Sequence, residues 1–184
     1  SELEWRDREG LIQGSLGDPS SYRSLAISPD DTMAAVLVTD MTIGTDDIWI
    51  FDLKRNLRSR FTFDPALDVY PVWSPDSGEI AYGCGQGGDT ETICVKAASG
   101  AGAARVVLDQ ERAARPTDWS ADGRYIVYES GPRASGRDLW VLPMEGDGQP
   151  FPFLQSEADE FMGELSPDGS WMAYVSKESG RSEV

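Results

Sequence analysis

Carboxylates are the side chains with which this chain could do acid–base chemistry, because it has no histidine. Its 184 residues include 32 Asp and Glu, 16 Lys and Arg, and no His. A Ser-His-Asp triad therefore cannot form, and the Gly-x-Ser-x-Gly nucleophile motif is missing as well. A pair of carboxylates that hydrolyses a glycosidic bond stays open as an alternative. Solvated turn acids are the simpler interpretation of these residues.

The acidic residues also raise the question of a metal site. Asp40, Asp46 and Asp47 lie close together in the sequence and suggest Ca²⁺. The Asp-x-Asp-x-Asp-Gly spacing of a calcium loop is absent, however. The sequence therefore assigns no catalytic residue, no metal ligand and no cofactor.

Four pairs of side chains are the candidate binding residues, because they place aromatic, cationic and acidic groups at one recurring position. The pairs are Tyr22 and Arg23, Asp68 and Tyr70, Arg115 and Asp118, and Phe161 and Glu164. Each pair belongs to a connecting segment that is expected to reach one mouth of a central channel. Binding residues concentrate in such segments on a rigid scaffold. Variable loop residues without a ligand are the alternative interpretation.

These candidates recur because the chain is built from a repeat. A turn motif, Ser-Pro-Asp with variations, begins at Ser28, Ser74, Ser120 and Ser166, so each interval is 46 residues. Proline pre-sets φ for a tight turn, and Ser and Asp side chains can bond nearby backbone N–H groups. Short apolar runs flank every copy, which predicts a hairpin around each turn.

The apolar runs of each full repeat predict four short strands, which we call a, b, c and d in chain order. They are expected at 24–28, 32–39, 47–53 and 59–63, at 70–73, 79–84, 92–97 and 105–108, and at 116–119, 124–129, 138–143 and 151–154. Four strands in each 46 residues are typical of β-propeller blades. Trp49, Trp73, Trp119 and Trp140 recur in register, which indicates packing between blades.

We therefore predict an all-β fold, a β-propeller of four-stranded antiparallel blades, over residues 1–184. The expected boundaries are a c–d half-blade at 1–17, blades at 18–64, 65–109 and 110–155, and an a–b half-blade at 156–184. The two complementary half-blades could complete a four-bladed ring within one chain or an eight-bladed ring between two chains. Of these two closures we expect the second, a homodimer closed by exchanged half-blades.

The cysteines could form a disulfide in the second repeat. Cys84 and Cys94 are symmetric about residue 89, so a simple hairpin would place them opposite each other. Such a bond fits an oxidising compartment. The matching positions in other repeats hold Val38, Ser130 and Ser176 for the first cysteine, and Trp49 and Trp140 for the second. This comparison favours two packed thiols over a disulfide.

The repeats resemble the TolB-like β-propeller repeat family. The resemblance rests on the Trp-Ser-Pro-Asp box, an Ala-Tyr pair in strand b and an Asp-Ile/Leu-Trp start of strand c, with the best copies at 73–82, 166–174 and 138–141. It covers the whole chain, although Ala121 replaces the proline in one box and Asp31 the glycine in another. Similar propellers occur in periplasmic TolB, beside bacterial serine/threonine kinases and winged-helix regulators, and in prolyl-oligopeptidase-type enzymes.

The resemblance implies a non-enzymatic scaffold for protein–protein interaction or ligand sensing within a larger bacterial protein, with an unidentified protein or small molecule as partner. The alternative is the propeller part of a hydrolase, either a prolyl-oligopeptidase-type peptidase or a carboxylate-based glycan enzyme. A formal net charge of −16 argues against nucleic-acid binding. No apolar run is long enough to span a bilayer, and no signal-peptide pattern opens the chain. We expect a periplasmic or other extracytoplasmic location, with the cytoplasm as the alternative.

Overall fold

The computed structural model describes residues 1–41, 44–63, 66–85, 92–131, 136–146 and 148–184. Within these ranges the regular structure consists of antiparallel β-strands, which confirms the all-β prediction. Three four-stranded sheets correspond to the three full repeats. In each of them, strands that follow one another in the sequence pair with one another, so every sheet is a simple meander.

The first sheet contains β3 (Ser21–Ile27), β4 (Met33–Asp40), β5 (Thr45–Asp52) and β6 (Leu57–Arg60). The second contains β7 (Val69–Trp73), β8 (Glu79–Cys84), β9 (Thr92–Ala97) and β10 (Arg105–Leu108). The third contains β11 (Ala114–Trp119), β12 (Tyr125–Ser130), β13 (Asp138–Pro143) and β14 (Phe151–Leu154). Two-stranded sheets precede and follow them: β1 (Leu3–Arg6) with β2 (Ile12–Leu16), and β15 (Glu160–Leu165) with β16 (Met172–Ser176).

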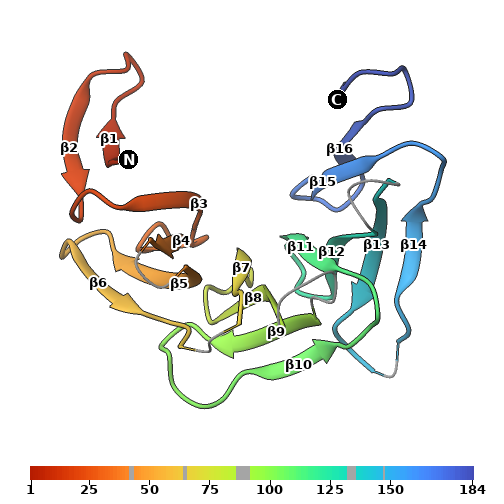
Figure 1. The fold of residues 1–184 in the computed structure, drawn as a ribbon, viewed down its shortest axis with the longest axis horizontal. Coiled ribbons are helices and arrows are strands. Elements are labelled where there is room, and N and C mark those ends of the chain that lie inside the picture. Colours follow the sequence, from red (N-terminus) through yellow and green to blue (C-terminus); the bar gives the residue numbers. More distant parts are fainter. Residues whose placement is uncertain (42–43, 64–65, 86–91, 132–135, 147) are drawn as a thin grey trace.

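The five sheets stand side by side along an open arc, with β3, β7, β11 and β15 on its inner side (Figure 1). The two-stranded sheets lie on opposite sides of the opening and do not pair with each other. A four-bladed ring within one chain, which is one of the two closures that the sequence allows, is therefore not formed in this structure.

The outer strand of the first blade differs from its predicted position. It was expected at 59–63, but β6 ends at Arg60. The next residues bond to a single residue of β5: the Phe61 N–H donates to the Ile48 carbonyl at 2.8 Å, and the Ile48 N–H donates to Thr62 Oγ1 at 3.0 Å. These bonds turn the Phe61 ring into the core, where it is 2% exposed.

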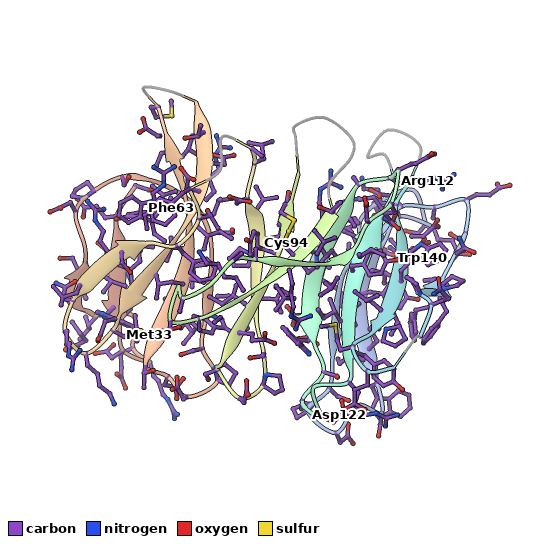
Figure 2. The ribbon with its side chains drawn as sticks, turned by 90° about the horizontal axis from the view of Figure 1, so that it is seen from below. Met33, Phe63, Cys94, Arg112, Asp122 and Trp140 are labelled. Atoms are coloured by element: carbon purple, nitrogen blue, oxygen red, sulfur yellow. A yellow bond between two sulfur atoms is a disulfide. The ribbon has the colours of Figure 1, made fainter. Side chains whose placement is uncertain are left out.

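Each Ser-Pro-Asp turn is closed by the same hydrogen bonds. In the second repeat, Ser74 Oγ donates to Asp76 Oδ1 at 2.6 Å and accepts the Glu79 N–H at 2.8 Å, while Asp76 Oδ1 accepts the Gly78 N–H at 2.9 Å. The equivalent bonds occur in the turns that begin at Ser28, Ser120 and Ser166. Figure 2 shows Asp122 of one such turn at the edge of the molecule opposite Arg112.

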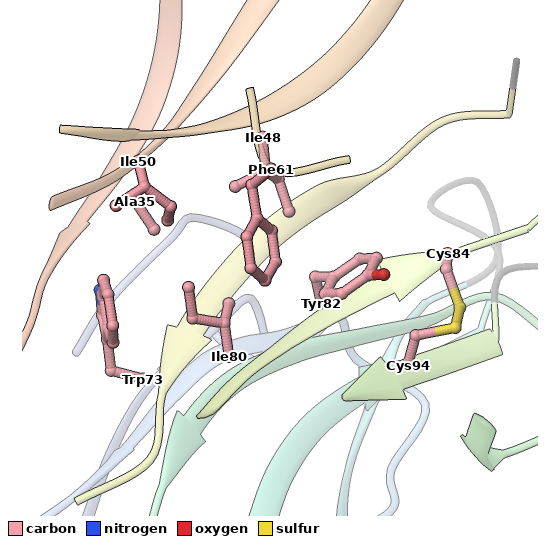
Figure 3. Packing of buried hydrophobic residues seen from close by; sticks show 9 residues of the cluster. All are labelled: Ala35, Ile48, Ile50, Phe61, Trp73, Ile80, Tyr82, Cys84 and Cys94. Carbon is pink, nitrogen blue, oxygen red and sulfur yellow. A yellow bond between two sulfur atoms is a disulfide. The ribbon is translucent and has the colours of Figure 1, made fainter. Parts of the chain in front are cut away.

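The core lies between neighbouring blades. One cluster of buried residues joins the first blade to the second and consists of Ala35, Ile48, Ile50, Phe61, Trp73, Ile80, Tyr82, Cys84 and Cys94 (Figure 3). Trp73 Nε1 donates to the Ala26 carbonyl of the preceding blade at 2.9 Å. This tryptophan therefore packs between blades, because each sheet is too small to bury both of its faces alone.

A disulfide joins Cys84 and Cys94 at the edge of this cluster (Figure 3). The hairpin pairs Cys84 with Thr92 and Cys94 with Tyr82, so the cysteines are diagonal neighbours and do not lie opposite each other. Their Cα atoms are 5.8 Å apart, a separation that a disulfide readily spans. The preference for two packed thiols is therefore wrong for this structure, because the ladder brings both side chains to one face of the sheet.

Candidate functional site

A groove on the inner side of the arc is the candidate functional site. Its volume is about 500 Å³, and residues of all four inner strands line it. Most of the lining is apolar or aromatic, and includes Leu25, Tyr70, Pro71, Val72, Pro116, Phe161 and Met162; its charged residues are Arg115, Glu129, Arg137 and Glu164. A concave, largely apolar surface with a few charged groups is the usual form of a ligand site. We call it the inner groove.

A β-bulge interrupts each inner strand. The irregularities fall between residues 22 and 25, 69 and 72, 116 and 118, and 161 and 164. Tyr70 and Met162 occupy equivalent positions two repeats apart, and have φ of 56° and 57°. Bulky side chains rarely adopt this backbone conformation, which costs about 1–3 kcal/mol. Both residues line the inner groove, and bulges and backbone strain are concentrated at functional sites.

A buried network of charged side chains connects the third four-stranded sheet to the C-terminal two-stranded sheet of β15 and β16. Arg137 donates from Nε and Nη2 to the two carboxylate oxygens of Asp159 at 2.8 and 3.0 Å. Its Nη1 donates to Glu129 Oε1 at 3.1 Å, and Arg115 Nη1 lies 3.9 Å from the same oxygen. Lys177 Nζ donates to Asp159 Oδ2 at 2.9 Å. The hydrogen bond from Arg137, supported by that from Lys177, holds the pKa of Asp159 well below its usual range.

The same network orients the aromatic wall of the inner groove. The Arg137 guanidinium lies 4.1 Å from the centroid of the Phe161 ring, and the Lys177 ammonium lies 5.5 Å from it. The Arg115 guanidinium lies 6.0 Å from the Tyr70 centroid. Cation–π contacts of this kind favour one ring position over others. Because Arg137 is paired with Glu129 and Asp159, it lends the groove little net positive charge.

Glu164 contributes an exposed carboxylate to the inner groove. Among the residues that the structure describes, no Lys or Arg forms an ion pair with it. Asp118 lies close enough to interact with this carboxylate. Burial raises the pKa of Asp118, and the charge of Glu164 makes a smaller contribution in the same direction. Asp118 accepts the Leu165 N–H at 2.7 Å and the Trp119 N–H at 2.8 Å, so its role is to join β11 to β15.

The inner groove brings together four of the eight candidate residues, namely Tyr70, Arg115, Phe161 and Glu164. Seven of the eight lie within inner strands and not in connecting segments. Tyr70 and Asp118 fall inside strands that the sequence predicts, whereas Tyr22, Arg23 and Arg115 are included because β3 and β11 begin earlier than predicted. Asp68 is the exception and lies directly before β7, where it is buried.

The other candidates have structural contacts away from the groove lining. Tyr22 packs edge-on against Phe51, with ring centroids 6.1 Å apart. Arg23 Nε donates to Thr39 Oγ1 at 2.9 Å. These contacts stabilise the first blade, so Tyr22 and Arg23 are not grouped with the groove residues.

Sequence reasoning missed Glu129 and Arg137. Glu129 has a local signal, because it is a charged residue in the apolar run of strand b, where the other repeats hold Leu37, Gly83 and Val175. Arg137 directly precedes strand c, and nothing in its neighbours indicates burial. Its partner Asp159 is 22 residues away, so only the contact between blades reveals the pair.

The acids considered for Ca²⁺ have protein partners. Asp47 accepts from Arg60 Nη2 at 2.8 Å, and Asp46 accepts from Thr39 Oγ1 at 2.5 Å. Within the described ranges, no three or more Asp, Glu, Cys or His side chains are grouped so as to hold a metal ion. In the same ranges, no helix has the length and apolar character required to cross a membrane.

The repeat, the meander sheets and the inter-blade tryptophans agree with a comparison to known families. The family model described as the TolB beta propeller domain matches residues 19–184. The chain belongs to this family. No curated protein sequence matches it significantly.

Solved structures show the same propeller fold. TolB from Acinetobacter baumannii superposes with a TM-score of 0.80 at 20% identity, over 98% of this chain and 44% of that one. A putative TolB from Agrobacterium tumefaciens gives 0.71 at 21% identity, over 95% and 69%. A structure from a study of two prolyl endopeptidases gives 0.66 at 18% identity, over 96% and 29%. The chain thus spans less than half of the Acinetobacter TolB, and at these identities the likeness shows the fold alone.

Proposed function

We propose that this TolB-type propeller is a non-enzymatic part of a larger bacterial protein and binds a partner segment in the inner groove. The observation that carries the proposal is the convergence of four inner strands on one largely apolar groove, whose wall contains the strained residues Tyr70 and Met162. Three of the nearby acids are held in structural contacts, because Glu129 and Asp159 are bonded to Arg137 and Asp118 accepts two backbone N–H groups. The alternative, that this chain is the propeller part of a hydrolase, is supported only by the similarity of its fold to that of prolyl endopeptidases.

The variant Tyr70→Gly tests peptide binding in the groove without a large change in the stability of the fold. Glycine is relaxed at positive φ, so relief of backbone strain offsets the lost ring packing and the free energy of unfolding stays within about 1 kcal/mol of the original. A library of random linear peptides is selected on the immobilised chain, and the selected peptides are then tested on the variant. We expect peptides that bind the original chain and lose affinity for Tyr70→Gly. Peptides that bind both equally, or turnover of a substrate by the isolated chain, would contradict the proposed function.

We further propose an extracytoplasmic location, which the Cys84–Cys94 bond supports because disulfides persist in oxidising compartments. Thiol titration of the unfolded, unreduced protein taken directly from its host should find no free thiol. Titration after reduction is the control and should find both cysteines. Two free thiols before reduction would remove this support.

We also propose that the 184-residue chain forms a homodimer by exchange of half-blades. The half-blades carry exposed apolar side chains, with Leu11 63%, Ile12 58% and Trp171 77% exposed. At the outer edge of β16, Glu183 pairs with Ser176. The third four-stranded sheet contains a similar pair, Asp138 with Ser130. We infer that the edge of β16 accepts a further strand in the register of a blade. Light scattering at micromolar concentration should give about twice the chain mass of 20.1 kDa. A stable mass near 20 kDa would rule the dimer out.

A further inference from the structure

We propose that the inner groove selects a linear peptide segment with a basic side chain, and that Glu164 receives this side chain. The inference rests on the proposed binding function and specifies the chemistry of the partner. Tyr70, Pro71, Pro116 and Phe161 give the groove an aromatic and prolyl surface, which suits an extended peptide better than a compact domain. The charge of the groove then decides which peptides fit.

The unpaired negative charge of the groove lies at Glu164. This carboxylate is exposed, lines the groove and has no ion-pair partner among the described residues. Asp118 adds a second carboxylate close by, whose charge interacts unfavourably with that of Glu164. A ligand ammonium or guanidinium at Glu164 would relieve this repulsion between like charges. The net charge of −16 attracts a cationic segment over longer distances as well.

Arg137, one of the two arginines that line the groove, gives an anionic ligand little to bind because its hydrogen bonds are already made within the protein. Arg137 already donates to both oxygens of Asp159 and to Glu129. An incoming carboxylate would have to break these buried bonds, which leaves an acid unpaired and is costly. Pro71 and Pro116 line the groove and supply no backbone N–H donor. Both features disfavour an acidic segment beside Arg137 and the two prolines and favour hydrogen-bond donors on the ligand there. The other groove arginine, Arg115, has Glu129 as its neighbour, with Nη1 3.9 Å from Oε1.

The test compares three synthetic peptides of one Pro- and Tyr-containing sequence, with Lys, Gln or Glu at a single central position. Affinities are measured by fluorescence anisotropy for the original chain, for Glu164→Gln and for Glu178→Gln. Glu178 is an exposed acid of the same half-blade outside the inner groove, so its variant makes the same change in net charge. We expect the Lys peptide to bind the original chain most tightly and to lose about fivefold in affinity with Glu164→Gln alone.

The outcomes separate this inference from the proposed function. If the three peptides bind equally and Glu164→Gln has no effect, but Tyr70→Gly abolishes binding, the groove binds peptides and the basic preference is wrong. An equal loss with Glu178→Gln would show long-range attraction only, and would overturn the role of Glu164. If Tyr70→Gly changes no affinity, the peptides bind elsewhere and both the inference and the proposed function fail. Glu164→Lys should reverse the order and favour the Glu peptide.

Discussion

Replacing Arg137 with Met should lower the free energy of unfolding by about 3–5 kcal/mol. The side chains of Arg137, Glu129 and Asp159 are only 11%, 6% and 9% exposed, so removal of the guanidinium leaves two buried carboxylates with weaker partners. Lys177 still reaches Asp159 at 2.9 Å, whereas Arg115 is 3.9 Å from Glu129. Chemical denaturation followed by tryptophan fluorescence measures the change.

Arg181→Met is the matched control for this prediction. Arg181 forms an ion pair of 2.8 Å with Glu183, but its side chain is 82% exposed. Exposed pairs contribute about 0–1 kcal/mol, so this variant should unfold almost as the original chain does. If the two arginine variants lose equal stability, the network does not join the blades as described.

Stability should fall steeply in acid because of Asp159. The folded-state pKa of this carboxyl is depressed, chiefly by the hydrogen bond from Arg137. Its stabilisation is therefore complete above the unfolded value of about 3.9 and is lost as the pH falls through the folded-state pKa. The expected loss is on the order of 2 kcal/mol. Asp118 acts in the opposite direction, because burial raises its folded-state pKa and its protonation favours folding as the pH falls.

Asp159→Asn isolates the contribution of this residue. Asparagine keeps the shape of the side chain but does not ionise, so the pH dependence of the difference in unfolding free energy between the original chain and the variant reports on Asp159. Denaturant titrations at a series of pH values should show a large difference near neutral pH that shrinks below about pH 4. A difference that stays constant with pH would mean that Asp159 stabilises the fold without a depressed pKa.

The local features of the fold could be predicted from the sequence. The Ser-Pro-Asp turns recur every 46 residues, and their bonds involve only residues within five positions of one another. Short apolar runs on both sides of each turn indicate strands regardless of what packs on them. For this reason the strands at 79–84, 92–97, 105–108, 138–143 and 151–154 have the predicted bounds. Family membership follows from the same local motifs.

Half of the candidate site could be predicted for the same reason. Tyr70, Arg115, Phe161 and Glu164 lie in inner strands, and the repeat places the inner strands of successive blades side by side. The repeat alone does not distinguish them from Tyr22 or Asp118, which occupy similar positions but pack within or between blades. Which inner-strand residues face the groove depends on the bulges and on the neighbouring blade.

The tertiary structure alone decided how the blades meet. The contact of Arg137 with Asp159 crosses from the third four-stranded sheet to the C-terminal two-stranded sheet, and it depends on the angle between the two sheets. The left-handed backbone of Tyr70 and Met162 is imposed by bulges, since neither residue favours it locally. The ladder between β8 and β9 set Cys84 two positions from the place opposite Cys94. The sequence by itself determined the repeating blade, because its turns and strands are local; the groove, its ion network and the open arc arise from packing between blades, which no single repeat encodes.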